Sequence, residues 1–382
     1  MTKKVLWITS YLPRSCGIAY YSDNYISAIK EYAKKHNKNI SVKIISHTDA
    51  KKADYPIINI NERDWIDKVF KIIKKENPSV VHIQHEYGLY ETYSDENNTL
   101  LELLRQLKKQ KIPVVMTYHS IYKKLEPHHK KFVSESLKLI SAGIFHEEYQ
   151  KLALKENIGR IPKNLFVLPH GSTPKLNLNK EKLKKEFGYN ERLVVGAAGI
   201  ADERKGFRTL IRQWPKVVKK FPDALLSLEI KPHVAKITRD YINKVMAKIM
   251  KSKVNKNIEI IVKDYGDLEF LRKLASFDVL ALPYKSESQS GVLAHGFASH
   301  TPAVVTDIEG LGAEIRNSKA GIAVKMKDRK HHFYKAIIKL LGSKKLRDKM
   351  SENAKKYVDE VSGWDIIAKK TFGIYEKIQK DQ

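Results

Sequence analysis

Residues 286–307 read SESQSGVLAHGFASHTPAVVTD, and an apolar run, FDVLALPY (277–284), precedes them. The order is a strand-like segment, a polar loop with Gly291, a helix of small residues, a Thr-Pro break and a second strand-like segment. Such an order forms a βαβ unit, whose loop lies at the carboxyl end of a parallel strand. Backbone N–H groups at the start of the following helix face anions, so the sequence predicts a ligand site at this loop.

Strand-like apolar runs alternate with amphipathic segments along the rest of the chain. The first alternation runs from VLWITSY (5–11) to LFVLPHG (165–171), and a second begins at RLVVGAAG (192–199). This pattern predicts an α/β fold of two Rossmann-like domains that face each other across a cleft. The polar residues 172–191, rich in Lys and Asn, predict a linker and a short helix. The expected domains are therefore residues 1–171 and 192–362, followed by a last helix at 363–382.

Cysteine usage and hydropathy limit the class of protein. The 382 residues contain one cysteine, Cys16, which excludes a disulfide framework and a cysteine-based zinc site. The N-terminal apolar run is too short for a signal peptide, and no window approaches the ~18 apolar residues of a membrane span. We therefore expect a cytoplasmic protein, and leave open a peripheral position on the inner face of the membrane.

The formal net charge is +28, from 71 Lys and Arg against 43 Asp and Glu. Such a charge suits nucleic acid, an anionic membrane surface or general solubility. The basic residues are spread along the chain and no zinc-finger, homeodomain or RNA-recognition pattern is visible, so we do not expect nucleic acid as a partner. The basic segment YKKLEPHHKKF (122–132) suits anionic lipid and a solvated surface equally.

A second candidate ligand loop, ADERKGFRTLI (201–211), follows the strand-like run LVVGAAG. It places Arg204 and Lys205 at the start of a helix, where cationic side chains add to the helix dipole in binding a diphosphate. A solvated Arg-Lys turn is the alternative. The segment around Gly199 is not GxGxxG, so a dinucleotide oxidoreductase is poorly supported. His82 and His85 point to opposite faces of a strand, so they are not expected to share a metal ion.

The arrangement resembles the GT-B fold and, within it, glycosyltransferase family 4, the retaining nucleotide-sugar enzymes. Residues 283–315 are similar to the donor-binding signature of that family, in which a Glu is followed by seven residues and a second Glu. Residues 14–26, RSCGIAYYSDNYI, resemble its first glycine loop, in the Cys-Gly-Ile-Ala form of one subgroup. Residues 362–378 look like its last helix, which crosses back onto the N-terminal domain. The resemblance covers essentially the whole chain.

The resemblance implies roles for residues of the second half. Glu287 stands at the first Glu, near the donor sugar and the reacting centre, whereas His295 replaces the second Glu, which holds the ribose. Lys205 matches the phosphate-binding Lys. The Arg that usually accompanies this Lys is missing, and Arg204 or Arg208 is its expected substitute. Further donor-binding residues implied by the loop are Gln289, Ser290, Gly291 and Val292.

In the first half the resemblance places Gly17 in the loop that closes over the donor phosphates. His119 stands where the family has a His beside the donor sugar, and we expect it to act in catalysis with Glu287. His85 and Glu86 end the previous strand, and we expect them to face the same cleft on the acceptor side. A His at a strand end is also often only a capped surface residue.

The function implied is that of a retaining glycosyltransferase, a hexosyltransferase, that moves a sugar from a nucleotide-diphosphate-sugar to a carbohydrate or lipid-linked acceptor. The nucleotide-sugar is a co-substrate, and neither a cofactor nor a metal is expected, since Lys205, helix N-termini and loop amides would stabilise the diphosphate. Two alternatives stay open. One is a GT-B phosphorylase or sugar-1-phosphate-using enzyme, and the other is a catalytically weakened GT-B binding or assembly subunit.

Overall fold

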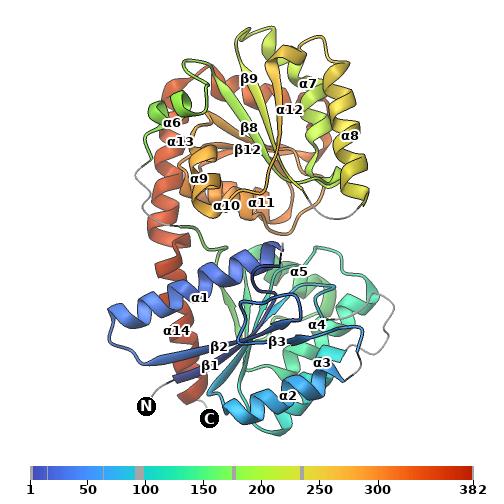
Figure 1. The fold of residues 1–382 in the computed structure, drawn as a ribbon, viewed down its shortest axis with the longest axis vertical. Helices are drawn as coiled ribbons and strands as arrows, with labels where there is room; N and C mark the ends of the chain where they lie inside the picture. Colours follow the sequence, from blue (N-terminus) through green and yellow to red (C-terminus); the bar gives the residue numbers. More distant parts are fainter. Residues whose placement is uncertain are drawn as a thin grey trace. The chain divides into compact units, whose positions relative to one another are not determined.

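The structure, a computed structural model, describes residues 3–14, 16–62, 64–90, 99–173, 178–232 and 236–380. Residues 174–177 of the expected linker lie outside the described residues. The chain divides into two compact units (Figure 1), residues 1–171 with 364–382 and residues 172–363. Each unit contains one sheet, with 7 strands in the first and 6 in the second, and this confirms the predicted α/β fold class.

The first unit is built on a parallel sheet in the order β3-β2-β1-β4-β5-β6-β7. Its strands are β1 (Lys3–Ile8), β2 (Ile40–His47), β3 (Tyr55–Ile58), β4 (Val80–His85), β5 (Val114–Tyr118), β6 (Ala142–Phe145) and β7 (Leu165–Val167). Its helices are α1 (Gly17–Lys35), α2 (Trp65–Glu76), α3 (Thr99–Lys109), α4 (Pro127–Leu139), α5 (Glu148–Ile158) and α14 (Trp364–Lys380).

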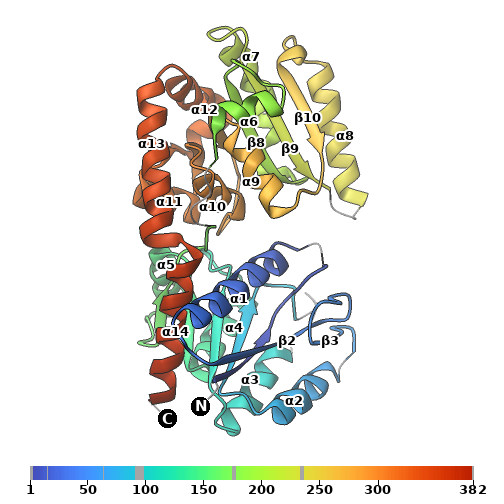
Figure 2. The same ribbon diagram turned by 60° about the vertical axis from the view of Figure 1, so that its left-hand side comes forward.

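Helices cover both faces of this first sheet. Helices α1 and α14 pack on one face, around Trp7, Tyr25 and Tyr375, and α2 to α5 pack on the other. The strands are buried on both sides, as a parallel sheet requires, which explains why β4 and β5 are buried along their whole length. Figure 2 shows α14, the last helix of the chain, beside α1, the first.

The second unit is built on a parallel sheet in the order β10-β9-β8-β11-β12-β13. Its strands are β8 (Val194–Ile200), β9 (Leu225–Lys231), β10 (Ile258–Val262), β11 (Val279–Leu282), β12 (Ala303–Asp307) and β13 (Gly321–Lys325). Its α-helices are α6 (Lys180–Glu186), α7 (Phe207–Val218), α8 (Lys236–Met250), α9 (Asp267–Ala275), α10 (Gly291–Ala298), α11 (Glu309–Ser318), α12 (Met326–Leu341) and α13 (Lys344–Tyr357). Short turns are η1 (Glu203–Lys205), η2 (Asn255–Asn257) and the π-helical η3 (Val358–Ser362).

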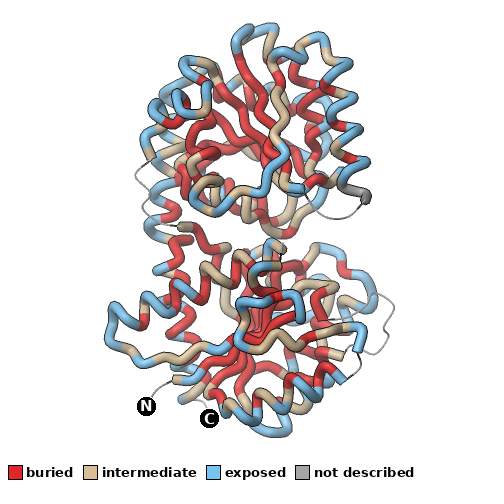
Figure 3. The backbone as a smooth tube through the Cα atoms, viewed as in Figure 1, coloured by how far each residue is buried: buried red, intermediate tan, exposed pale blue. Residues whose placement is uncertain are grey.

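Two apolar cores flank this second sheet. Helices α7, α8 and α12 pack on one face, and α9, α10, α11 and α13 on the other. Figure 3 shows the buried strands at the centre of each unit and the exposed helix surfaces around them. Helix α6 packs onto this unit through a buried ion pair, in which Lys184 Nζ lies 3.0 Å from Asp278 Oδ2.

The observed elements differ from the expected ones in a few places. The amphipathic segment SDNYISAIKEYAKKH (22–36) predicts a helix, and the observed α1 begins five residues earlier, at Gly17. Strand β3 is short and contains Pro56. Gly342 and Ser343 separate α12 from α13 in a segment that reads as one long amphipathic run. In the described parts of the chain, no helix combines the length and the apolar character needed to cross a bilayer.

Candidate functional site

The carboxyl end of β8 and the start of α7 hold the first group of candidate residues. The turn η1 ends at Gly206, whose φ of 73° is in the left-handed region that favours glycine. A Cβ on Gly206 would lie 2.3 Å from the carbonyl oxygen of Pro283, so only glycine allows this turn to approach the end of β11. The Lys285 N–H also donates to the Arg204 carbonyl over 2.7 Å. The two loops on which the sequence predicts ligand binding therefore lie against each other.

Lys205 and Glu287 form an ion pair where these loops meet. The side chains are 14% and 19% exposed, so the pair is largely shielded but still reached by solvent. The Lys205 Nζ lies 4.1 Å from the centre of the Tyr284 ring, and the Tyr284 hydroxyl donates to the Ala198 carbonyl over 3.1 Å. Burial by itself lowers the pKa of Lys205, but the attraction of Tyr284 and Glu287 outweighs it and leaves this pKa above its usual value. Lys205 is therefore a cation at neutral pH.

The loop that follows Glu287 ends at the N-terminus of α10. The Ser290 Oγ accepts a hydrogen bond from the Leu293 N–H over 3.3 Å and caps the helix. The N–H groups of Gly291 and Val292 belong to the first turn, where the helix itself supplies no acceptor. This end of α10 is thus suited to an anionic or hydroxyl-bearing ligand.

His295 lies one turn into α10. Its Nδ1 donates to the Gly291 carbonyl over 2.9 Å, so in the neutral ring Nε2 carries the lone pair. Burial lowers the pKa of His295, which keeps the ring neutral at pH 7. The imidazole can therefore accept one hydrogen bond from a ligand hydroxyl through Nε2.

Gln289 lies in the same loop with a buried side-chain amide. Its Oε1 and Nε2 make no hydrogen bond to any described residue. The loop backbone is fixed beside it by a close approach, because a Cβ on Gly310 would lie 2.1 Å from the Ser288 carbonyl oxygen. A buried amide without partners is costly unless a ligand satisfies it.

The expected arginine substitutes interact with neighbouring carboxylates. Arg204 donates from Nε and Nη2 to Asp202 Oδ2, over 3.0 and 2.8 Å, and its side chain is exposed. Arg208 Nη1 donates to Glu203 Oε1 over 2.6 Å. Lys205 is therefore the cation that the structure places directly at Glu287.

In the first unit, His119 follows β5 and lies in a buried polar chain. Its Nε2 donates to Gln84 Oε1 over 2.8 Å, and its Nδ1 lies 3.4 Å from His146 Nε2. The His146 Nδ1 donates to the Leu168 carbonyl over 3.0 Å. Burial, and then the neighbouring His146, lower the pKa of His119 well below its usual value. His119 is therefore neutral at pH 7, and the ring of Tyr21 packs edge-on against it at 4.8 Å.

The same polar chain continues to the last helix. The His82 Nε2 lies 2.9 Å from Thr117 Oγ1 and 3.2 Å from Gln84 Nε2. On its other side, His82 Nδ1 lies 2.6 Å from the Tyr375 hydroxyl of α14. Hydrogen bonds thus connect α14 to His119 through the interior of the first unit.

His85 does not join His119, which differs from the expectation that both face one cleft. Side chains alternate along β4, so Gln84 lies on the His119 side while His85 lies on the other. The His85 ring stacks on Phe132 at 4.4 Å, and its Nδ1 is buried without a hydrogen-bond partner among the described residues. Glu86 does lie near the end of β5, where its Oε2 accepts from Ser120 Oγ over 2.6 Å.

Gly17 is the first residue of α1, after a Cys16 N-cap that makes no side-chain cap. A Cβ on Gly17 would have no described atom within 4 Å. The fold of the described residues therefore does not itself require glycine here, and the space beside the backbone stays open to a ligand.

Replacing His85 with leucine is expected to stabilise the protein in mild acid. Burial, and then the neighbouring His129, lower the pKa of His85 in the folded protein to about 3. Below the ordinary pKa of histidine, the unfolded chain therefore binds a proton at His85 that the folded chain does not bind. The free energy of unfolding of the natural protein therefore has its full value above the ordinary pKa of histidine, and it decreases as the pH falls below that pKa. At about pH 5.5 the variant should be more stable than the natural protein by about 1 kcal/mol, and at about pH 7.5 this gain should vanish. Urea unfolding at both pH values measures it, and an equal difference at both would contradict the assignment.

Three residues of these groups were not predicted from the sequence. Gln84 and His146 flank His119, and Tyr284 lies beneath Lys205. Gln84 could have been found, because Gln84 and His82 are alternate polar residues in an otherwise apolar strand. His146 and Tyr284 give no such signal, because their positions follow from tertiary contacts.

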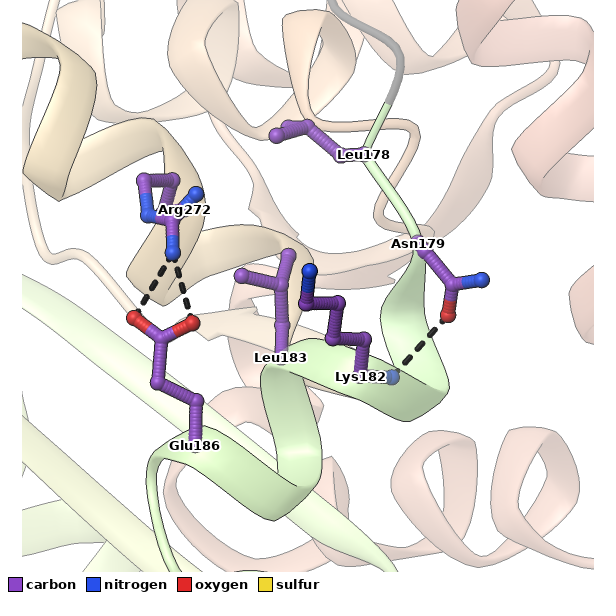
Figure 4. A pocket seen from close by; sticks show the side chains of 6 residues that line it. All are labelled: Leu178, Asn179, Lys182, Leu183, Glu186 and Arg272. Atoms are coloured by element: carbon purple, nitrogen blue, oxygen red, sulfur yellow. Dashed lines mark hydrogen bonds and ion pairs between the residues drawn. The ribbon is translucent and has the colours of Figure 1, made fainter.

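Two hollows in the described parts of the structure are lined by residues outside the candidate site, except that Arg208, an expected arginine substitute, lines the second of them. One hollow of about 320 Å³ lies between α6 and α9, and Figure 4 shows at its edge the ion pair in which Arg272 Nη2 donates to both carboxylate oxygens of Glu186. The other lies between α7 and α8. No three His, Cys, Asp or Glu side chains of the described residues gather as the ligands of one metal ion would.

Comparison with known proteins gives matches in sequence and in structure. The family model described as "Glycosyl transferases group 1" matches residues 191–343, which contain Lys205, Glu287 and His295. A protein of Methanocaldococcus jannaschii, described as an uncharacterized glycosyltransferase, is 24% identical over 392 residues, or 98% of each chain.

Solved structures match over nearly the whole chain. Sucrose-phosphate synthase from Thermosynechococcus elongatus has a TM-score of 0.76 and 14% identity, with 100% of both chains covered. HepE of Anabaena, in complex with UDP, has a TM-score of 0.71 and 13% identity, with 98% of this chain and 100% of that chain covered. At these identities the structures show the fold. The family match and the relative confirm that the chain is a transferase, and together they support a group 1 glycosyltransferase of the GT-B type.

Proposed function

We propose that the protein is a retaining glycosyltransferase that moves a sugar from a nucleotide-diphosphate-sugar to a carbohydrate or lipid-linked acceptor. The observation that carries the proposal is the shielded Lys205–Glu287 ion pair at the junction of the two candidate ligand loops. The Anabaena neighbour, whose structure is a complex with UDP, supports a nucleotide-diphosphate donor.

In the proposed mechanism, the pair exchanges partners when the donor binds. Lys205 turns to the diphosphate and stabilises the charge that develops on the leaving group. Glu287, released from Lys205, accepts hydrogen bonds from the hydroxyls of the donor sugar. The N–H groups of Gly291 and Val292 and the unpaired amide of Gln289 supply further hydrogen bonds.

The reaction forms a bond between an acceptor oxygen and the anomeric carbon and breaks the bond from that carbon to the phosphate oxygen. The acceptor attacks on the face from which the diphosphate leaves, and its proton passes to the departing phosphate. We propose that neutral His119, which Gln84 orients through Nε2, positions the donor sugar and does not act as an acid. No step in this scheme uses a metal ion.

His295 is proposed to hold the ribose with one hydrogen bond to Nε2. A carboxylate at this position would accept hydrogen bonds from two ribose hydroxyls, whereas a single imidazole accepts one and therefore binds the ribose more weakly. Together with the Asp202-bound Arg204, this suggests that Lys205 supplies a larger share of donor binding than in enzymes with both groups.

Replacing Glu287 with glutamine tests the proposal. The amide keeps the shape but loses the charge that accepts sugar hydroxyls, so transfer should fall about 10-fold to 100-fold while the fold is retained. The matched control is Glu203→Gln, which removes an exposed carboxylate one loop away and should change transfer less than about twofold.

The assay first requires a donor, found by thermal shift with UDP-, GDP- and ADP-sugars and with sugar-1-phosphates. Stabilisation by a nucleotide-sugar and its turnover are the expected result. Preference for a sugar-1-phosphate would favour a phosphorylase, and binding of no donor would favour an assembly subunit. An unchanged rate in Glu287→Gln would overturn the site assignment.

A further inference from the structure

Arg329 is a buried cation of the second unit that the candidate site has not yet included. It lies in the first turn of α12, and the residue is 8% exposed. Its backbone is fixed against α7, because Gln213 Nε2 donates to the Arg329 carbonyl over 3.0 Å. The buried guanidinium therefore starts from a well-defined place on the helix.

The guanidinium of Arg329 connects the two candidate ligand loops. Its Nη1 donates to the Pro283 carbonyl over 3.2 Å and to Thr209 Oγ1 over 3.3 Å. Pro283 directly follows β11 and precedes the loop that contains Glu287. Thr209 lies in the first turn of α7, where its N–H donates to the Gly206 carbonyl over 2.8 Å. One side chain thus holds the end of β11 to the start of α7.

The Pro283 carbonyl also sets how closely these loops approach. Gly206 packs against it so tightly that a Cβ there would lie 2.3 Å from the carbonyl oxygen. Arg329 binds the same oxygen from α12. A shift of this carbonyl would move the end of β11 relative to the turn that carries Lys205. The contact between Lys205 and Glu287 therefore depends on where this carbonyl lies.

The charge of Arg329 has no carboxylate partner among the described residues. By contrast, each of the cations Arg204, Lys205 and Arg208 pairs with a carboxylate. The Arg329 Nε is buried without a hydrogen-bond partner in the described structure. Burial, and then the neighbouring Arg212, lower the pKa of the Arg329 guanidinium. Its hydrogen bonds to neutral oxygens are what offsets the burial of this charge.

The position of Arg329 opposes two local preferences. A buried ion without an opposite charge is costly, and the first turn of a helix disfavours a cation. What the charge supplies is strength, because a hydrogen bond from a charged donor is about twice as strong as one between neutral groups. Proteins depart from local preferences mainly at functional sites. The cost is understandable if the position of the Pro283 carbonyl matters to the site beside it.

We propose that Arg329 is a positioning residue of the candidate donor site. It holds the Pro283 carbonyl, and with it the loop of Glu287, against the turn that carries Lys205. It acts through these loops and contacts neither the sugar nor the phosphates. The inference rests on the proposed donor site, so its test includes a measurement that needs no donor.

Competitive acetylation of the lysines, followed by mass spectrometry, tests the positioning in the full chain without a donor. Lys205 should react slowly in the natural protein, because Glu287 and the loops shield its amino group. Arg329→Met removes the charged donor and should raise the labelling of Lys205 about 10-fold, the usual effect on an equilibrium of losing a hydrogen bond from a charged group. Arg329→Lys keeps a cationic donor and should restore most of the shielding.

Lys273 and Arg347 provide the controls. Lys273 is buried in the same unit, with its side chain 3% exposed, so its labelling reports opening of the whole unit. Arg347 Nη1 donates to two carbonyls at the other end of α12, over 2.8 and 2.7 Å, so Arg347→Met removes comparable hydrogen bonds outside the site. It should leave the labelling of Lys205 unchanged. Unchanged labelling of Lys205 in Arg329→Met, or an equal rise at Lys273, would overturn the proposal.

A double-mutant cycle with Lys205→Ala tests the effect on sugar transfer. Arg329→Met alone should reduce kcat/KM for the donor about 10-fold. With Lys205→Ala already present, the further loss should be less than about twofold, because both changes act through Lys205. Additive losses would contradict a positioning role, since general destabilisation would add to any other change.

A milder variant serves if circular dichroism shows that Arg329→Met does not fold. Thr209→Val removes only the hydroxyl that accepts from Arg329, and it should raise the labelling of Lys205 about twofold, as expected for one weak hydrogen bond. No rise would count against the proposal. If no nucleotide-sugar binds, the transferase proposal fails, while the labelling still decides whether Arg329 positions the loops.

Discussion

Replacing Lys205 with alanine is expected to reduce sugar transfer by about 100-fold to 1000-fold while the protein stays folded. Lys205 is the cation that lies against Glu287, and its pKa is held above the usual value, so its charge is available to the diphosphate throughout the neutral range. The substitution removes a stabilising charge from the leaving group at the point where negative charge develops. Initial rates at saturating and limiting donor measure the effect on both kcat and KM.

A neighbouring lysine provides the control for Lys205→Ala. Lys285 belongs to the same loops, but its Nζ pairs with Glu203 Oε2 over 3.3 Å at an exposed position. Its replacement with alanine should change transfer less than about twofold, since exposed pairs contribute little. Comparable losses in both variants would mean that general positive charge, and not the placement of Lys205, supports the reaction.

Replacing Lys273 with methionine is expected to lower the free energy of unfolding by about 3–5 kcal/mol. Lys273 and Glu229 are 3% and 1% exposed, and the Lys273 Nζ lies 3.3 Å from Glu229 Oε1. The same ammonium donates to the Tyr189 hydroxyl and lies 4.6 Å from the ring centres of Phe187 and Tyr189. Methionine fills the space but leaves the buried Glu229 charge without its cation. Urea unfolding at neutral pH measures the loss.

An exposed ion pair in the same unit is the control for the effect of burial on the free energy of unfolding. Lys263 pairs with Glu269 at exposed positions, and its replacement with methionine should change the free energy of unfolding by less than about 1 kcal/mol. Adding Glu229→Gln to Lys273→Met should cost less than the sum of the two single changes, because each removes the same pair. A loss below about 1 kcal/mol for Lys273→Met would show that the buried pair does not stabilise the fold.

Much of the fold can be predicted from the sequence, because parallel strands that are buried on both faces consist mainly of apolar residues. The run VVMTY corresponds to β5 and VLAL to β11. The sequence does not reveal β3, because four residues with a proline are too short to show a period. The split between α12 and α13 at Gly342 is also hidden, since the amphipathic pattern continues across it.

The candidate site can be predicted from the sequence only in part. The loops of Lys205 and Glu287 could be predicted to bind anions, and the resemblance to a family suggested that they act together. The contact itself depends on Gly206 approaching Pro283, a tertiary fit that no local pattern encodes. For His85, its place at the end of a strand was not enough to predict its neighbours. Side chains alternate along β4, so that Gln84, and not His85, contacts His119.

The position of α14 in the first unit bears on how the protein is made. The chain leaves the first unit after residue 171 and supplies its final helix only from Trp364 onward. A ribosome would therefore synthesise all of the second unit while one face of the first sheet still lacks the apolar surface of α14. The second unit can mature first, although it is encoded later, and the first unit is completed only after residues 364–380 have been synthesised. Loss of residues 364–380 would accordingly damage the unit that is built mainly from residues 1–171.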